Sequence, residues 1–318
     1  MHFSPIVTNS RKEKQTMKTL LKHCPRLKHC PSKKGESAAL TSIQVKSGTA
    51  TITDARFWLS FPLDKPDGFY SITEARADIW KPAKGLGDLE FPQIEIPNKQ
   101  PIEVPVSISD LTWISSAMSN EKIRYYLNGV YFDNAGMTAT DGHILKHVAQ
   151  PFAGEEKPSA ILPDFAVKII LDAAKEEKVT GISIQFIGPR AIVAIGRYLL
   201  RTKLVDGTFP DYTRVIPEST TGLAIAFDSE EIKPLLKKAR ALDPECQTVI
   251  VGQNSCHIHK APEEAVKLSG SWEMPLAFNC GLLVSADIAG TVNYAMEGMI
   301  KITNRNRVCV TMSQRLPN

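Results

Sequence analysis

The triplet Asp141-Gly142-His143 combines two side chains of a catalytic type. A histidine can act as a general base, and an aspartate two residues away on a strand shares its face and can orient it. Catalysis would also require a nucleophile or a metal beside the pair. The sequence has no activated-serine motif, no phosphate-binding glycine loop and no HExxH spacing. A turn-forming Asp-Gly with a structural histidine explains the triplet better, so we expect no catalytic residue and no enzyme activity.

Potential metal ligands stand near the amino terminus, in the near-repeat KHCPRLKHCP at residues 22–31. They are His23, Cys24, His29 and Cys30. A proline follows each cysteine, and the second ligand pair of a structural zinc site is missing. We therefore expect neither a metal nor another cofactor, and we interpret the basic residues 1–36 as a lead-in segment. Met17 resembles a natural start, so residues 1–16 are interpreted as a tail or as foreign to the native protein.

The composition is that of a protein with buried cores: 318 residues, 43% of them hydrophobic, with a net charge of +4. This length suits two or three domains. Six scattered cysteines do not make a disulfide framework. No apolar run approaches the roughly 20 residues of a membrane span, and the first residues lack the apolar centre of a signal peptide. We expect a cytoplasmic protein without membrane contact.

A series of strand, helix and hairpin recurs along the chain at a period of roughly fifty residues. Short strands at 41–45, 50–53 and 55–61, a short helix at 73–79 and an irregular linker marked by Pro82, Pro92 and Pro97 come first. The middle series occurs twice. Its first copy predicts a strand at 104–108, a helix at 109–118 capped by Ser109 or Asp110, and a hairpin of 126–132 with 137–147. Its second copy predicts a strand at 160–162, a helix at 164–177 and a hairpin of 182–186 with 191–205. The last series predicts strands at 223–227, 248–251, 256–259 and 276–278, helices at 229–242 and 281–288, and a closing hairpin of 299–303 with 308–312. Duplicated units of this kind must pair to bury their apolar faces, which indicates the α+β class.

Three phrases occur in a fixed order: RYYLNG at 124–129, ATDGH at 139–143 and KLVDGTFPDYTRVIP at 203–217. Together they resemble the middle domain of the bacterial DNA polymerase III beta sliding clamp. The resemblance is good over residues 100–217, fair over 218–318 and weak before residue 100. It implies a DNA clamp architecture, with tandem domains of repeated units, helices lining a central channel and sheets outside. The implied domains are 1–99, a tail plus a reduced first domain, then 100–217 and 218–318.

In that family, partner proteins insert a short peptide with hydrophobic ends into a pocket between the middle and last domains. The resemblance assigns to this pocket Leu127, Thr140, Gly142, His143, Leu145, Pro210, Arg214, Val215, Val310, Met312 and Arg315. The apolar members would form a cup, Gly142 would let a partner backbone come close, and Met312 could repack around different ligands. The alternative is that Leu127, Leu145 and Val215 are core residues. Ser313 and Gln314 replace the usual Pro and Met, which implies a more polar rim.

Basic residues on predicted helices are candidates for contact with DNA phosphates. Lys233, Lys237 and Arg240 fall at i, i+4 and i+7 of one helix, and Lys168 and Lys175 do so at a spacing of seven on another. Such a stripe attracts phosphates without reading bases, although a charged helix face is commonly just a solvated face. The resemblance adds Tyr125, Arg214 and, less directly, Tyr126, since a tyrosine can stack on a base.

The family's chains join head to tail, first domain to last, to close a ring. On the last domain the resemblance places this contact near Ala241 and Leu242. Most of the second repeat of the first domain is missing between about residues 79 and 92, and a heterologous interface needs both of its surfaces.

We therefore expect a non-enzymatic sliding clamp, a homodimer that encircles or grips duplex DNA and tethers a DNA polymerase, the clamp loader and other replication or repair proteins. One alternative is a clamp-derived adaptor that binds partner peptides without a closed ring. A more distant one is an enzyme that uses Asp141 and His143.

Overall fold

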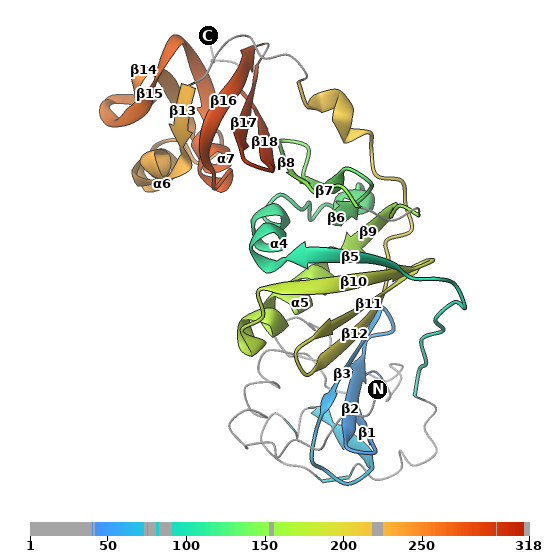
Figure 1. Ribbon diagram of the computed structural model, residues 1–318. Helices are drawn as coiled ribbons and strands as arrows, with labels where there is room; N and C mark the ends of the chain where they lie inside the picture. Colours follow the sequence, from blue (N-terminus) through green and yellow to red (C-terminus); the bar gives the residue numbers. More distant parts are fainter. Residues whose placement is uncertain are drawn as a thin grey trace. The chain divides into compact units, whose positions relative to one another are not determined.

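The computed structural model describes residues 40, 42–72, 75, 81–82, 91–152, 156–217, 225–296 and 298–314. The chain divides into two compact units (Figure 1). Unit 1 combines Met1–Leu111 with Leu162–Val205, and unit 2 combines Thr112–Ile161 with Asp206–Asn318. Both units thus draw on the expected middle domain, and the boundaries at residues 99 and 217 stay a prediction.

Unit 1 is built on an antiparallel eight-stranded sheet in the order β4-β1-β2-β3-β12-β11-β10-β5. Its strands are β1 (Ser42–Lys46), β2 (Thr49–Thr53), β3 (Phe57–Pro62), β4 (Gly68–Ser71), β5 (Ile102–Ser107), β10 (Gly181–Ile187), β11 (Arg190–Ile195) and β12 (Tyr198–Lys203). Helix α5 (Asp164–Glu177) packs on β11 and β12 through its apolar side (Figure 1). The rings of Phe165 and Phe57 lie 6.0 Å apart and extend this core to β3.

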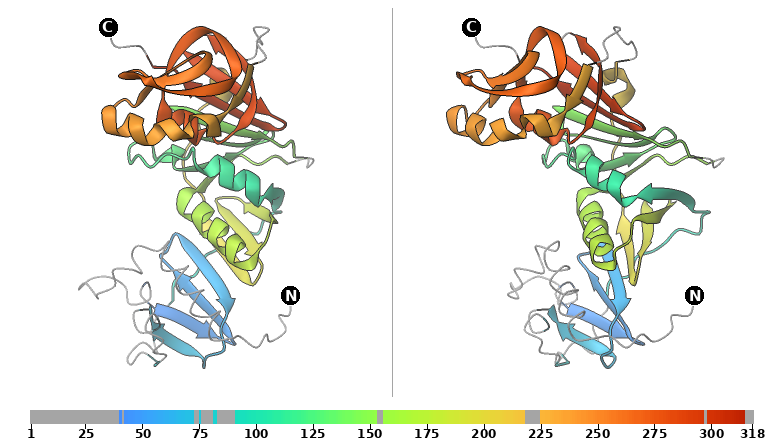
Figure 2. Two further views of the ribbon diagram at one scale, coloured as in Figure 1. Left: turned by 90° about the vertical axis from the view of Figure 1, so that its left-hand side faces the viewer. Right: turned by 60° about the vertical axis from the view of Figure 1, so that its left-hand side comes forward.

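Unit 2 has a second eight-stranded sheet in the order β13-β16-β17-β18-β8-β7-β6-β9, and β14 pairs with β15 separately. Its strands are β6 (Gly129–Phe132), β7 (Gly136–Thr140), β8 (Ile144–Ala149), β9 (Ala160–Pro163), β13 (Ile225–Asp228), β14 (Thr248–Ile258), β15 (Ala261–Asn279), β16 (Ala289–Met296), β17 (Met299–Asn304) and β18 (Arg307–Met312). Helix α6 (Ser229–Leu242) packs on α7 (Cys280–Ser285), β14 and β15 (Figure 2). Helix α4 (Ile108–Ser115) begins in unit 1 and ends in unit 2.

Several predicted elements differ from the structure in their boundaries. The predicted strand at 126–132 begins with the 3₁₀ turn Tyr125–Leu127. The predicted strand at 137–147 is divided into two strands, because Asp141 Oδ1 accepts from the backbone N–H groups of His143 (2.8 Å) and Ile144 (3.0 Å) and turns the chain. Similarly, residues 191–205 fold back at Gly196, whose φ is +54°. Helix α4 starts one residue early, and Ser107 rather than Ser109 or Asp110 accepts from its first turn.

Other predictions were incomplete. Strand β16 was missed, and β14 and β15 are much longer than expected. The predicted helix at 73–79 and the gap in the first domain fall largely outside the described residues.

Trp113 of α4 connects the first half of the expected middle domain to the last one. Its indole N–H donates to the carbonyl oxygens of Ala286 (2.9 Å) and Asp287 (2.8 Å) just after α7. Two cations flank the ring, with Lys146 Nζ 4.7 Å and the Arg307 guanidinium carbon 5.2 Å from its centroid. This shared N–H stabilises the fold because it gives both carbonyl oxygens a hydrogen-bond donor in place of the water that they lose on burial.

We predict that Trp113→Phe lowers the free energy of unfolding by about 1–3 kcal/mol in urea denaturation, because two carbonyls lose their donor. The matched control is Trp272→Phe: Trp272 is 2% exposed, and its indole nitrogen has no hydrogen-bond partner among the described residues. This control should show only the loss of ring volume. Equal losses in both variants would mean that the indole hydrogen bonds of Trp113 do not contribute.

Candidate functional site

One face of the unit 2 sheet is packed against Trp113 of α4. Lys146 of β8 points to this face, where its Nζ donates to the Trp113 carbonyl (3.1 Å) and to Ser116 Oγ (2.7 Å). Cys309 of β18 lies directly opposite Lys146. Burial lowers the pKa of Lys146 to about 8 and raises the pKa of the Cys309 thiol to about 12. Both groups are inaccessible to solvent and serve the core.

The opposite face gathers predicted site residues from distant parts of the chain. Successive strand residues point to opposite faces, so Leu145 points away from the face of Lys146. Thr140 of β7, Leu145 of β8 and Val310 of β18 stand in direct register across three strands. At the end of β18, the backbone N–H of Met312 donates to the His143 carbonyl (3.3 Å). We call the surface formed by these five residues the docking face.

The segment from Phe209 to Pro217 lies over the same face of the sheet and is fixed at three points. The contacts are the Phe209 ring stacked on Tyr131 at 4.8 Å, the Tyr212 ring stacked on His147 at 5.3 Å, and Lys301 Nζ donating to the Pro217 carbonyl at 2.7 Å. Lys301 stands opposite Val310, so the third contact adjoins the docking face. The segment thereby holds Pro210, Arg214 and Val215, which are all exposed, over the sheet.

A single carboxylate supports both this segment and the turn beneath it. Asp133 Oδ1 accepts from the N–H groups of Ala135 (2.8 Å) and Gly136 (3.1 Å), while Asp133 Oδ2 accepts from the Tyr212 hydroxyl (2.9 Å). Burial raises the pKa of Tyr212, which keeps the hydroxyl a donor. Burial lowers the pKa of His147, because it disfavours the charged imidazolium. The sequence analysis did not identify these positioning residues; the aromatic residues in FPDY and the turn-forming Asp133 were the available signal.

Exposure separates the predicted docking residues into two groups. Val215 is 47% exposed and Met312 is 45% exposed. Leu127, Leu145 and Val310 are at most 5% exposed. The alternative interpretation as core residues therefore describes Leu127 and Leu145 but not Val215.

The backbone conformation at position 142 favours glycine. Its φ is +94°, and a Cβ there would lie 2.6 Å from Arg124 Nη1. Arg124 also pairs with Glu121 (2.7 Å) and donates to the Asp141 carbonyl (3.3 Å). The end of the flexible Arg124 side chain lies in this space, and the approach of a partner backbone at Gly142 stays a prediction.

Asp141 and His143 do not form a catalytic pair in this geometry. His143 Nδ1 lies 3.9 Å from Asp141 Oδ1, which instead accepts the two backbone N–H groups of the turn. Among the described residues, no three His, Cys, Asp or Glu side chains are grouped to hold a metal ion. The repeat at 22–31 and Arg315 lie outside the described residues.

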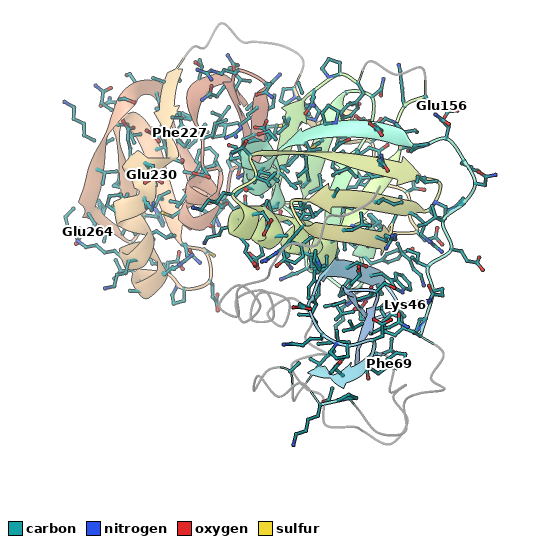
Figure 3. The ribbon with its side chains drawn as sticks, turned by 60° about the horizontal axis from the view of Figure 1, so that its bottom comes forward. Lys46, Phe69, Glu156, Phe227, Glu230 and Glu264 are labelled. Atoms are coloured by element: carbon teal, nitrogen blue, oxygen red, sulfur yellow. The ribbon has the colours of Figure 1, made fainter. Side chains whose placement is uncertain are left out.

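Helix α6 exposes the predicted basic stripe and buries its other side. Lys233, Lys237 and Arg240 are exposed, whereas Ile232 and Leu235 are buried. Lys233 pairs with Glu230 in the first turn of the helix (2.9 Å). Figure 3 labels Glu230 on this helix. No ion pair is seen for Lys237 or Arg240 within the part of the chain that the structure describes, so their charges are available to a ligand.

The remaining candidates are also at the surface. On α5 of unit 1, Lys168 and Lys175 are exposed, with Lys168 paired to Asp164 (2.6 Å). In unit 2, Tyr125 is 51% exposed, and its ring centroid lies 5.9 Å from that of the half-buried Tyr126.

Ala241 and Leu242 are exposed at the end of α6. Ile123, missed by the sequence analysis, is 89% exposed. No helix within the described ranges is both long and apolar enough to span a membrane.

Comparisons with known proteins agree on one family. Residues 107–211 match the family model of the DNA polymerase III beta subunit, central domain. The beta sliding clamp of Vibrio cholerae is 32% identical over 169 residues, covering 49% of this chain and 44% of that protein. The beta sliding clamp of Escherichia coli K12 is 34% identical over 145 residues, covering 43% and 38%. These alignments span less than half of each relative's length.

Solved structures extend the likeness of the fold to nearly the whole chain. The beta subunit of DNA polymerase III from Thermotoga maritima superposes with a TM-score of 0.75 at 17% identity, covering 98% of this chain and 99% of that one. The sliding clamp of Pseudomonas aeruginosa bound to griselimycin gives 0.73 at 18% identity, covering 94% and 98%. Residues 107–211 are therefore similar to the central domain of the DNA polymerase III beta subunit, and the chain as a whole has the sliding-clamp fold.

Proposed function

We propose that this protein is a DNA sliding clamp, a processivity factor that encircles or grips duplex DNA. It tethers a DNA polymerase, the clamp loader and other replication or repair proteins through short peptides bound at the docking face. The observation that carries this proposal is the gathering of Thr140, Leu145, Val310 and Met312 in adjacent strands, beside a fixed segment that presents Val215. The partly exposed Met312 and Val215 offer apolar surface to a partner, and the thioether adapts to ligands of different shape.

Such a protein acts by binding alone. Tethering raises the effective concentration of a polymerase at its template without any new chemistry. The exposed Lys237 and Arg240 of α6 support contact with phosphates, which is independent of base sequence and compatible with sliding. Self-association would use the exposed end of α6 at Ala241 and Leu242, in a head-to-tail homodimer.

We predict that Met312→Asp weakens binding of griselimycin, and of a labelled heptapeptide with hydrophobic residues at its ends, by more than about ten-fold in calorimetry. The reason is that a charge would replace an apolar contact. Val215→Asp should behave alike. Leu127 is unsuitable for this test because it is 3% exposed, so a charge there would test folding. Ile123→Asp, at an exposed apolar residue outside the docking face, is the control; equal effects at Ile123 and Met312 would refute the placement of the site.

We predict that the double variant Lys237→Ala, Arg240→Ala reduces the slope of log affinity for duplex DNA against log salt by roughly two, one for each lost phosphate contact. Fluorescence titrations at several salt concentrations measure this slope. Lys267→Ala, which removes an exposed lysine from β15, is the matched control and should leave the slope unchanged. An unaltered slope in the double variant would remove α6 from the DNA-binding surface.

Encirclement predicts twice the 35.1 kDa chain mass in solution. It also predicts retention on closed circular duplex DNA that is lost once the circle is cut, because a ring slides off a free end. Light scattering measures the mass, and gel filtration of the protein loaded on circular DNA measures the retention. A single-chain mass, with equal retention on cut and closed circles, would instead support an adaptor that binds partner peptides without forming a ring.

A further inference from the structure

The last residue of β18 and the two residues after it are held by successive backbone hydrogen bonds to three different parts of unit 2. The Met312 N–H donates to the His143 carbonyl in the β7–β8 turn (3.3 Å). The Ser313 N–H donates to the Gly298 carbonyl beside β17, and the Gln314 N–H donates to the Ala277 carbonyl of β15 (2.7 Å). The backbone of residues 312–314 is therefore fixed in position.

The side chain of Gln314 adds a fourth point of attachment. Its Nε2 donates to the Cys246 carbonyl in the α6–β14 connection (3.1 Å), and Asn279 Nδ2 donates to the same oxygen (2.8 Å). A carbonyl oxygen has two lone pairs and only accepts, so these two amides satisfy it completely and Gln314 must present its nitrogen there. Asn279 in turn accepts from the Leu282 N–H at the start of α7 (3.0 Å). The glutamine thus anchors residues 312–314, which we call the terminal segment, to the α6–β14 connection.

This anchor lies two residues from Met312, the exposed apolar residue of the docking face. Met312 is 45% exposed, and packing leaves its side chain accessible to a partner. Ordering a flexible segment on binding costs affinity, and a segment that is already ordered avoids this cost. The backbone at Met312 is fixed by its own hydrogen bond to the His143 carbonyl and by the hydrogen bonds that Ser313 and Gln314 make just after it.

We propose that Gln314 is a positioning residue for partner binding, which pre-organises Met312 by hydrogen-bonding the terminal segment to the Cys246 carbonyl. The inference deepens the proposed function and rests on it. The ligand contacts Met312, while the amide of Gln314 acts through the backbone. The hydrogen bond rather than the bulk of the side chain is responsible, since it is the amide N–H that reaches the carbonyl.

The test compares Gln314→Ala and Gln314→Met in the full-length chain. Methionine retains the length and volume of glutamine but cannot donate, so both variants should bind griselimycin and the labelled heptapeptide about three- to ten-fold more weakly. Hydrogen exchange measured without ligand should become faster at the amides of Met312 and Ser313. Gln185→Ala, which removes one exposed hydrogen bond to Glu103 in unit 1, is the matched control and should change neither quantity.

The outcomes separate this inference from the function on which it rests. Wild-type or tighter binding in Gln314→Met, with reduced affinity in Gln314→Ala, would overturn it, because side-chain packing or an apolar rim would then explain the effect. Unchanged affinity and unchanged exchange in both variants would also overturn it, while Met312→Asp could still abolish binding and leave the docking face intact. Absence of binding of either probe to the wild-type chain would reject the docking face itself, and this inference with it.

Discussion

The antiparallel pairing of β8 with β18 is the contact on which the rest of unit 2 depends. Five residue pairs, from Ile144 with Thr311 to Val148 with Arg307, join segments that are far apart in the sequence. This seam places Lys146 and Cys309 on the face packed against α4, and Leu145 and Val310 on the docking face. A slip of one residue would exchange the two faces of a strand and turn the lysine or the thiol of the core toward the docking face. The core and the candidate site therefore require the same register.

The sequence alone predicted best the elements whose signals are local. Helices α5 and α6 have the predicted bounds, 164–177 and 229–242, because each combines a clear apolar stripe with an acidic residue at its start. For α6, Asp228 accepts from the Glu230 N–H (2.9 Å) as a helix cap. The hairpins were predicted less well. A tight turn such as Asp141-Gly142-His143 has the same residue types whether it reverses the chain or binds a ligand, so its sequence does not show where one strand ends and the next begins.

The candidate site could be predicted only in part, for a related reason. Resemblance to a family named the residues of the docking face, and two of them, Thr140 and His143, lie in the recognisable phrase ATDGH. The residues that support them could not be recognised in this way. Asp133 and Tyr212 are 79 positions apart, and neither carries a local mark of their hydrogen bond. Gln314 had been interpreted as a more polar rim, whereas the structure shows its amide donating to the Cys246 carbonyl.

Both eight-stranded sheets cross the limits of the region that matches the central-domain family. Strand β12 pairs with β3, β10 pairs with β5, and β8 pairs with β18, so three strands of residues 107–211 obtain a neighbour from outside that region. A fragment cut at those limits would leave three rows of backbone N–H and C=O groups without partners. Unpaired strand edges of this kind recruit strands from other molecules. The family match thus marks a unit of inheritance that is not a unit of folding, and its excised form would aggregate rather than persist as a monomer.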